Sequence, residues 1–553
     1  MARDITRRCV MAAGASALLW GRAFAKSPSL DIALVNARVW TGTPGTMSDA
    51  VGISGNRIAV VGAAAVRRAS GKTTRVVDLQ GALVMPAFIE NHTHFLKGAL
   101  ALAQPELLGA RSRGDFAKRI GRAARMNPGQ WITGQSWDEE RMGGALPTRE
   151  WIDAVTPDTP VAVPRSDLHM LLLNGAALKL AGIDRNTPDP EGGVIIRDPS
   201  GEPTGILKDN AKQLVERVIP APSPAQEAAA LRAAIALGHA HGIAQCHIPE
   251  IDWAAHEALR RAPIAREQGM RFNSMVPIQD WRKIAATIAE EGRGDAWVRW
   301  GGVKGLADGS LGSRTALFYA PYSDAPNWSG VRILPLDELR DLVDGADRAG
   351  LQIAVHAIGD RANDDVLDVF EAVAKKNGGR DRRFRIEHAQ HVRPATIPRF
   401  SRQGVIASMQ PYHAIDDGRW AVKRIGEDRL DGTYAFESFI RSGAHVTFGS
   451  DWPVAPLDPI LGIHAAVTRE TIDGANPGGW LPEQKATVEQ AMRAYTLENA
   501  YAGFQERVVG RIAPGYLADI IVLDQDITRV DAEQIKDTKI LRTIVDGVER
   551  YAV

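Results

Sequence analysis

Short apolar runs alternate with helical stretches through the middle of the chain. Eight of these runs have the length of buried strands. An alternation of strand and helix is typical of a parallel α/β sheet, and eight is the number of strands that closes a barrel. We therefore expect an α/β fold built on a TIM-like (β/α)8 barrel. The expected strands are Leu83 to His94, Gly242 to Pro249, Arg271 to Ile278, Val298 to Gly309, Leu351 to Gly359, Phe384 to Gln390, Val405 to His413 and His445 to Val454.

The two ends of the chain have a different pattern, in which apolar and polar residues alternate. Residues Leu30 to Asp78 predict short antiparallel strands separated by Gly and Asn, and a similar pattern returns between Ala518 and Gly547. Each end is too small to bury a core by itself. We therefore expect residues 28–82 and 505–553 to pair into one small composite β-sandwich.

The barrel itself is expected over residues 83–504. The gap between its first two strands is far too long for a simple crossover connection. We therefore expect an insertion after the first barrel strand, at about 99–222, that forms a lid or subdomain over the barrel mouth. This insertion carries Trp137 and the Gly- and Pro-rich run 189–193.

Charge and composition narrow the class of partner. The 553 residues carry 66 Lys and Arg against 66 Asp and Glu, so no net charge attracts nucleic acid or anionic lipid over a long range. Hydrophobic residues make up 45% and charged residues 24%, which is ordinary for a globular protein. We expect a small-molecule substrate and no nucleic-acid partner, and the sequence leaves a homo-oligomer open.

Residues 1–25 predict an export signal. Arg7 and Arg8 precede an apolar stretch from Cys9 to Trp20, and residues 23–25 form a small-x-small cleavage site. The paired arginines fit a twin-arginine signal, so we expect a periplasmic protein without stable membrane insertion after cleavage. A membrane anchor is the alternative, but it needs about 20 unbroken apolar residues, and this stretch provides about 12.

A His-x-His triplet lies where the first expected barrel strand ends. Residues i and i+2 of a strand point to the same face, so the rings of His92 and His94 can face one interior metal ion. A second triplet, His239 to His241, ends an Ala-rich helix, where residues two apart diverge by about 200°. We expect no function for this second triplet.

Other ligand-type residues fall near the carboxyl ends of later strands. His356, His388 and Asp451 end the fifth, sixth and eighth strands, and Lys304 lies in the fourth. Taken singly, each has a simpler interpretation, such as a hydrogen-bonded core histidine, a helix-capping aspartate or a packed lysine stem. A barrel gathers these strand ends on one face, where barrel active sites lie. The joint placement therefore favours a metal-dependent active site.

The order His-x-His, Lys, His, His, Asp on successive barrel strands resembles the amidohydrolase superfamily. Further motifs look like its family-3 branch, which includes N-substituted formamide deformylases. The similarity runs from about Leu30 to the C-terminus and includes the insertion. The motifs that carry it are Pro86 to His94, Asp167 to His169, Asn174 to Leu178, Gly201 to Leu207, Val303 to Ala316, Ser408 to Pro411 and Gly449 to Val454.

The resemblance implies a pair of divalent metal ions, expected to be zinc, bridged by Lys304 in a carboxylated form. Without that modification of Lys304, a single-metal site is the alternative. The implied ligands are His92, His94 and Asp451 on one ion and His356 and His388 on the other, with Lys304 between them.

The implied reaction follows from the metal. Coordination lowers the pKa of water from 15.7 to about 7, so a metal-bound hydroxide can attack the C–N bond of an amide, formamide or N-acyl compound. Asp451 would take the proton of the water and pass it to the leaving nitrogen. His169 or His413 would stabilise the oxyanion, and Trp137 and Arg314 are further candidates for substrate binding.

Two other functions stay open at this point. The same centre could hydrolyse a cyclic amide or an ester, because loops rather than the fold decide specificity. An exported binding protein that kept the barrel without turnover is the alternative from a different class. The complete set of ligand-type residues argues against this second alternative.

Overall fold

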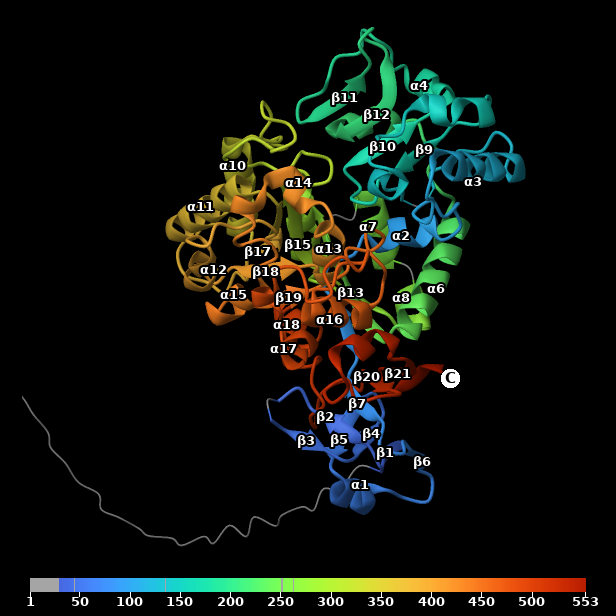
Figure 1. Cartoon of the computed structure of the whole chain (residues 1–553). Coiled ribbons are helices and arrows are strands. Elements are labelled where there is room, and N and C mark those ends of the chain that lie inside the picture. The colour runs from blue at the N-terminus through green and yellow to red at the C-terminus, as the bar shows by residue number, and fades with distance from the viewer. Residues whose placement is uncertain (1–28, 44, 135, 250–251, 262) are drawn as a thin grey trace, which may run out of the picture.

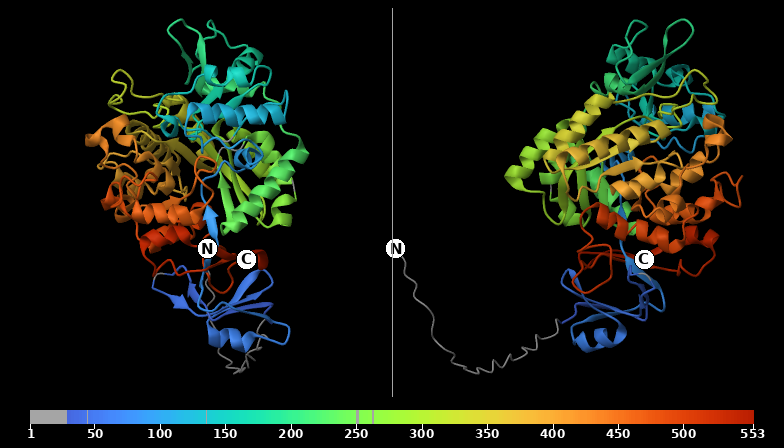
Figure 2. Two further views of the ribbon diagram at one scale, coloured as in Figure 1. Left: turned by 45° about the vertical axis from the view of Figure 1, so that its right-hand side comes forward. Right: turned by 90° about the vertical axis from the view of Figure 1, so that its left-hand side faces the viewer.

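A computed structural model describes residues 29–553, except 44, 135, 250–251 and 262. The expected export signal lies outside the described residues. A central barrel carries the insertion at one end and a small β domain at the other, as both views in Figure 2 show. Within the described part of the chain, no helix is both long and apolar enough to cross a membrane.

Eight parallel strands form the central sheet, which confirms the expected TIM-like barrel (Figure 1). Most of these strands are buried along their whole length, which explains why they are continuous apolar runs in the sequence. In hydrogen-bonded order they are β8 (Phe88–Glu90), β13 (Ile243–Ile248), β14 (Arg271–Pro277), β15 (Val298–Leu306), β16 (Gln352–Ala357), β17 (Arg385–His388), β18 (Ile406–Met409) and β19 (Val446–Phe448).

The seam between β8 and β19 is closed just beyond the strands. Thr93 and Trp452 form a parallel bridge, and the Asp451 N–H donates to the His92 carbonyl at 2.7 Å. The buried side-chain amide of Asn499 donates to backbone carbonyls of both neighbouring segments. The seam therefore places the first and last metal-ligand motifs of the sequence next to each other.

Helices cover the outside of the barrel and follow the strands in the order that the sequence predicts. Helix α6, which leads from the insertion to β13, begins at Pro224, where Ser223 and Gln226 form a capping box. The helices of the barrel are α2 (Phe95–Ala101), α6 (Pro224–Ala240), α7 (Trp253–Arg261), α8 (Ile264–Gln268), α9 (Trp281–Glu291), α10 (Leu336–Arg348), α11 (Asp360–Asn377), α12 (Ile397–Gln403), α13 (Pro411–Asp417), α14 (Ala421–Ile425), α15 (Phe436–Arg441), α16 (Pro459–Thr468), α17 (Val488–Ala494) and α18 (Leu497–Ala502).

The small β domain consists of two packed sheets, and both ends of the chain contribute to it. One sheet has the order β5-β4-β1-β6 and the other β22-β21-β20-β7-β2-β3, with apolar side chains of both buried between them. Its elements are β1 (Ile32–Val35), β2 (Arg38–Trp40), β3 (Met47–Ser48), β4 (Val51–Ser54), β5 (Arg57–Val61), α1 (Ala63–Ala69), β6 (Arg75–Asp78), β7 (Leu83–Pro86), β20 (Ile520–Leu523), β21 (Ile540–Val545) and β22 (Val548–Ala552).

Two details of this region differ from the prediction. The run Leu83 to His94 is not one barrel strand, because β7 pairs with β2 and β20 in the small domain and only β8 lies in the barrel. The chain changes sheet at Ala87, whose N–H donates to the Asp519 carbonyl. In addition, β1 and β6 are parallel rather than antiparallel, because helix α1 returns the chain to the same end of the sheet.

The insertion is a subdomain with its own apolar cores. A four-stranded antiparallel sheet of order β11-β12-β10-β9 forms its centre. The turn between β9 and β10, residues 165–169, lines the cavity at the barrel mouth. The elements of the insertion are α3 (Arg113–Met126), β9 (Ala162–Pro164), β10 (Met170–Leu173), α4 (Gly175–Ala181), β11 (Gly193–Arg197), β12 (Pro203–Asp209) and α5 (Gln213–Glu216).

Candidate metal centre

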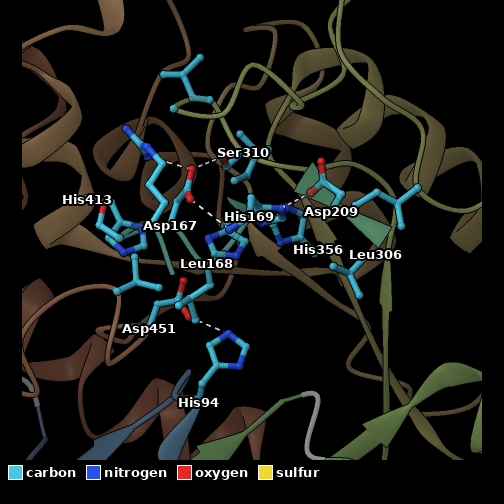
Figure 3. Close-up of a pocket in the computed structure, with 18 of the residues that line it drawn as sticks. His94, Asp167, Leu168, His169, Asp209, Leu306, Ser310, His356, His413 and Asp451 are labelled. Carbon is cyan, nitrogen blue, oxygen red and sulfur yellow. Dashed lines mark hydrogen bonds and ion pairs between the residues drawn. The ribbon is translucent and has the colours of Figure 1, made fainter. Parts of the chain in front are cut away.

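A cavity of about 540 Å³ lies between the carboxyl ends of the barrel strands and the insertion. Figure 3 shows residues from both parts of the molecule facing this space. The structure thus brings together most of the residues selected from the sequence. Those that line the cavity are His92, His94, His169, Lys304, His356, His388, His413 and Asp451.

The first group of ligand atoms combines the His-x-His motif with the aspartate beyond β19. The Nε2 atoms of His92 and His94 lie 3.3 and 3.2 Å from Oδ1 of Asp451. All three side chains offer ligand atoms within 4.8 Å of one another. This is the arrangement expected for the first ion.

A second group shares the same aspartate. His388, His413 and Asp451 also offer ligand atoms within 4.8 Å of one another. His413 was expected at the end of a strand, but it lies on helix α13, which Pro411 begins. The structure therefore places His413 among the potential metal ligands, where the sequence suggested a role in stabilising the oxyanion.

The buried nitrogen and oxygen atoms of these groups test whether a metal fits. His92 Nε2, His388 Nδ1, His413 Nε2 and Asp451 Oδ1 are all buried without a well-formed hydrogen bond among the described residues, and His92 Nε2 and Asp451 Oδ1 meet only in an ion-pair contact at 3.3 Å. A buried polar atom without a hydrogen bond costs about 1–3 kcal/mol, so the gathering of such atoms in two overlapping ligand groups needs an explanation. Imidazole and carboxylate atoms are the ligands that zinc and similar divalent ions take in proteins. The residues present therefore fit a metal centre.

His356 differs from the prediction. Its Nε2 lies 3.0 Å from the Gly309 carbonyl oxygen and 3.5 Å from Oδ1 of Asp308. The ring packs against His388, with centroids 4.5 Å apart, but His356 belongs to neither ligand group of the described residues. In this structure the loop after β15 contacts His356 Nε2, and its predicted place beside His388 as a metal ligand stays a prediction. Lys304, only 2% exposed, lines the same cavity from β15.

The pKa shifts of Asp451, His388 and His413 favour the protonation states that metal ligands need. Burial raises the pKa of Asp451, but the neighbouring His92, His94 and His388 together hold it well below its ordinary value. Burial also lowers the pKa of His388 well below its usual range, and it lowers that of His413. Metal ligands must be deprotonated carboxylates and neutral imidazoles, which is the state that these shifts favour.

Glu387, which the sequence did not single out, orients His92. Its Oε2 lies 2.6 Å from His92 Nδ1, and it accepts further hydrogen bonds from Arg385 and Ser408. This contact turns His92 Nε2 toward Asp451, as carboxylates behind metal-ligating histidines commonly do. The signal in the sequence was a pair of charged residues, Arg385 and Glu387, in a strand that is buried along its whole length, β17.

The insertion contributes a second His–carboxylate pair. His169 Nδ1 lies 2.6 Å from Oδ1 of Asp209, and both residues line the cavity (Figure 3). Burial lowers the pKa of His169, but the hydrogen bond and charge of Asp209 outweigh this and raise it above its ordinary value. Sequence reasoning selected His169 and missed Asp209, because Asp209 ends a strand of the insertion, β12, that the sequence did not predict.

Two predicted substrate-binding residues do not line the cavity. Trp137 is fully buried in the core of the insertion, and its indole N–H donates to the Val163 carbonyl at 2.9 Å. Arg314 forms two hydrogen bonds with Asp324, which hold its guanidinium beside the loop after β15. In this structure each side chain makes its hydrogen bonds away from the cavity, and a role of either residue in substrate binding stays a prediction.

Comparison with known proteins gives extensive similarities. The model of the amidohydrolase family matches residues 75–551. Protein LONG AFTER FAR-RED 3 of Arabidopsis thaliana is 36% identical, over 94% of this chain and 91% of that protein. N-substituted formamide deformylase of Arthrobacter pascens is 29% identical, over 94% and 98%. The crystal structure of an uncharacterized metal-dependent hydrolase from Pyrococcus horikoshii OT3 superposes with a TM-score of 0.73 and 29% identity, over 91% of this chain and 99% of that one.

Proposed function

The chain belongs to the amidohydrolase family, and from this premise we propose that it hydrolyses the C–N bond of an amide, formamide or N-acyl compound. The observation that carries the proposal is the presence of two groups of buried His and Asp ligand atoms in the cavity, which share Asp451. A catalytic acid–base pair that worked without a metal ion would leave several of these buried ligand atoms without a hydrogen bond. The family and this geometry together support a metal-dependent hydrolase.

Two zinc ions bridged by a carboxylated Lys304 are the form of the centre that we propose, with a single-metal site as the alternative. His92 and His94 would hold one ion, His388 and His413 the other, and Asp451 lies within reach of both groups. A divalent ion held there would supply an activated water, because coordination lowers the pKa of water to about 7. Asp451, at the junction of the two ligand groups, would serve as the general base and acid that accepts a proton and delivers it to the leaving nitrogen.

Two observations support an amide as the substrate: the residues that line the cavity and the name of one relative. Apolar side chains lie among the polar residues that line the cavity, as expected for a site that binds an organic substituent. A relative covering nearly the whole chain is named for deformylation of N-substituted formamides, which supports an amide C–N bond as the target. A cyclic amide or an ester remains the second candidate, since the same residues would serve it. The apolar lining residues include Leu168, Leu306, Leu311, Ile333, Leu334 and Ile358.

A substrate panel with metal removal tests the proposal. The purified chain should hydrolyse at least one member of a set of N-substituted formamides, N-acyl amines, lactams and esters. A chelator should abolish this activity, and zinc or manganese should restore it, because the ligand atoms depend on the ion for their function. The same chelator presaturated with zinc serves as the control. Full activity in protein shown to be metal-free, or metal binding without any hydrolysis, would contradict the proposal.

We also propose that the protein is exported to the periplasm by the twin-arginine route. The support is the pattern of residues 1–25, with Arg7 and Arg8 before the apolar stretch. Export in a folded state would allow the metal to be loaded in the cytoplasm. Fractionation of cells that produce the full chain tests this, since retention of the whole pool in the cytoplasm would rule it out.

A further inference from the structure

We propose that Asp209 is a positioning residue that holds His169 with its Nε2 directed to the scissile amide. This inference rests on the proposed hydrolysis and adds a contribution of the insertion to it. The two residues come from β12 and from the turn before β10, so they reach the cavity from the side opposite to the barrel strands (Figure 3).

His169 is held at three points. Its backbone N–H donates to Oδ1 of Asp167 at 3.0 Å, and its carbonyl accepts the Asp209 N–H at 3.0 Å. Its Nδ1 lies 2.6 Å from Oδ1 of Asp209. Because Nδ1 is engaged in this way, Nε2 is the ring nitrogen that remains for a substrate. The His169 ring also lies beside the His356 ring, with centroids 5.2 Å apart, which places it over the ends of the barrel strands.

The local backbone indicates that this placement is selected by function. Leu168 and Asp209 have φ values of 60° and 47°, a left-handed conformation that residues other than glycine rarely adopt. Such conformations persist where the surroundings enforce them, and they gather at functional sites. Lys212 Nζ donates to the Leu168 carbonyl at 2.6 Å and so helps to hold the turn. One of the two unusual residues directly precedes His169, and the other is Asp209 itself.

The turn is also fixed to the barrel. Asp167 accepts hydrogen bonds from Ser310 at 2.5 Å and Ser313 at 2.8 Å, both in the loop after β15. Arg165 donates to the same carboxylate at 2.9 Å. His169 therefore sits on a turn that is tied to the barrel loop, as a preorganised catalytic contact requires.

The contacts of the two carboxylates separate their roles. Asp167 bonds to several groups of the turn and of the barrel loop, which is the pattern of a structural residue. The side chain of Asp209 bonds to His169, and its Oδ2 is buried without a hydrogen-bond partner among the described residues. Because the buried Asp209 side chain bonds to His169, we expect Asp209 to act through that ring. Replacing Asp209 should therefore affect His169 more than the fold.

The test compares Asp209→Asn, His169→Ala and the double variant in the full, metal-loaded chain. We expect Asp209→Asn to lower kcat by about 10- to 100-fold with little change in KM, metal content or melting temperature, because the contact acts in the transition state. In the His169→Ala background, Asp209→Asn should have no further effect, since it acts through that ring. Asp189→Asn is the matched control, because Asp189 bonds to Ile195 and Arg197 within the same insertion and does not line the cavity.

Several results would overturn the inference. A wild-type kcat in Asp209→Asn excludes a role for the contact, and multiplying effects in the double variant exclude action through His169. Loss of metal or of folding in Asp209→Asn, but not in Asp189→Asn, shows a structural role instead. In these cases the wild-type chain is active and the proposed function stands. A wild-type chain that hydrolyses no member of the panel overturns the proposed function and this inference together.

Discussion

Replacing Asp451 with Ala is expected to remove bound metal and lower kcat/KM by about 10³-fold or more, which corresponds to about 4 kcal/mol of lost transition-state stabilisation. Asp451 is the one residue that belongs to both ligand groups of the described chain, and it is also the proposed proton acceptor. His92→Ala should have a similar effect, because it removes a ligand at the seam of the barrel. Metal analysis and steady-state kinetics on the purified variants measure both losses.

A loss of metal and activity in Asp451→Ala and His92→Ala supports the site only if both variants still fold like the wild type. Circular dichroism and the melting temperature should stay close to those of the wild type, because Asp451 and His92 lie at the ends of strands rather than within the apolar core. His241→Ala is the matched control, since His241 is partly exposed beside Asp458 on the outside of the barrel. Full activity in His92→Ala or Asp451→Ala would refute the site.

Lys304→Ala is expected to lose metal and most activity, with partial recovery in buffer that contains a short carboxylic acid. Lys304 is 2% exposed and lines the cavity beside the ligand groups. An uncharged or cationic group there would not neutralise two divalent ions, whereas a carbamate or a diffusible carboxylate would. Metal content measured with and without propionate checks this expectation.

Lys97→Ala provides the comparison for this experiment, because Lys97 also lines the cavity but is exposed to solvent. It should keep both metal and activity, and propionate should not change either value. Unchanged metal content in Lys304→Ala would count against a bridging carbamate and favour the single-metal form.

Much of the fold could be predicted because its barrel strands are buried on both faces and therefore stand out as apolar runs. The division of Leu83 to His94 between two sheets could not, because it depends on the pairing of β7 with β20, more than 400 residues away. The parallel pairing of β1 and β6 was missed for a related reason. Helix α1 carries the chain back to the end of the sheet where β1 starts, so that β6 runs in the same direction as β1.

The candidate site could be predicted from the sequence only in part, as the fold could. His92, His94 and Asp451 could be selected because residues at the ends of barrel strands must meet, whatever the loops do. The positions of His413 on a helix and of His356 against Gly309 depend on loops whose course the sequence does not give. Glu387 and Asp209 act on His92 and His169 through contacts between distant parts of the chain, and a local pattern does not identify such a partner.

The most direct measurement of the central claim is anomalous X-ray scattering from crystals of the purified, active protein, collected on both sides of the zinc absorption edge. The account predicts a peak about 2.0–2.2 Å from ligand atoms of His92, His94 and Asp451, with a second peak at His388 and His413 in the two-metal form. An active protein with no anomalous peak at either group, at the zinc edge or at that of another transition metal, would contradict it.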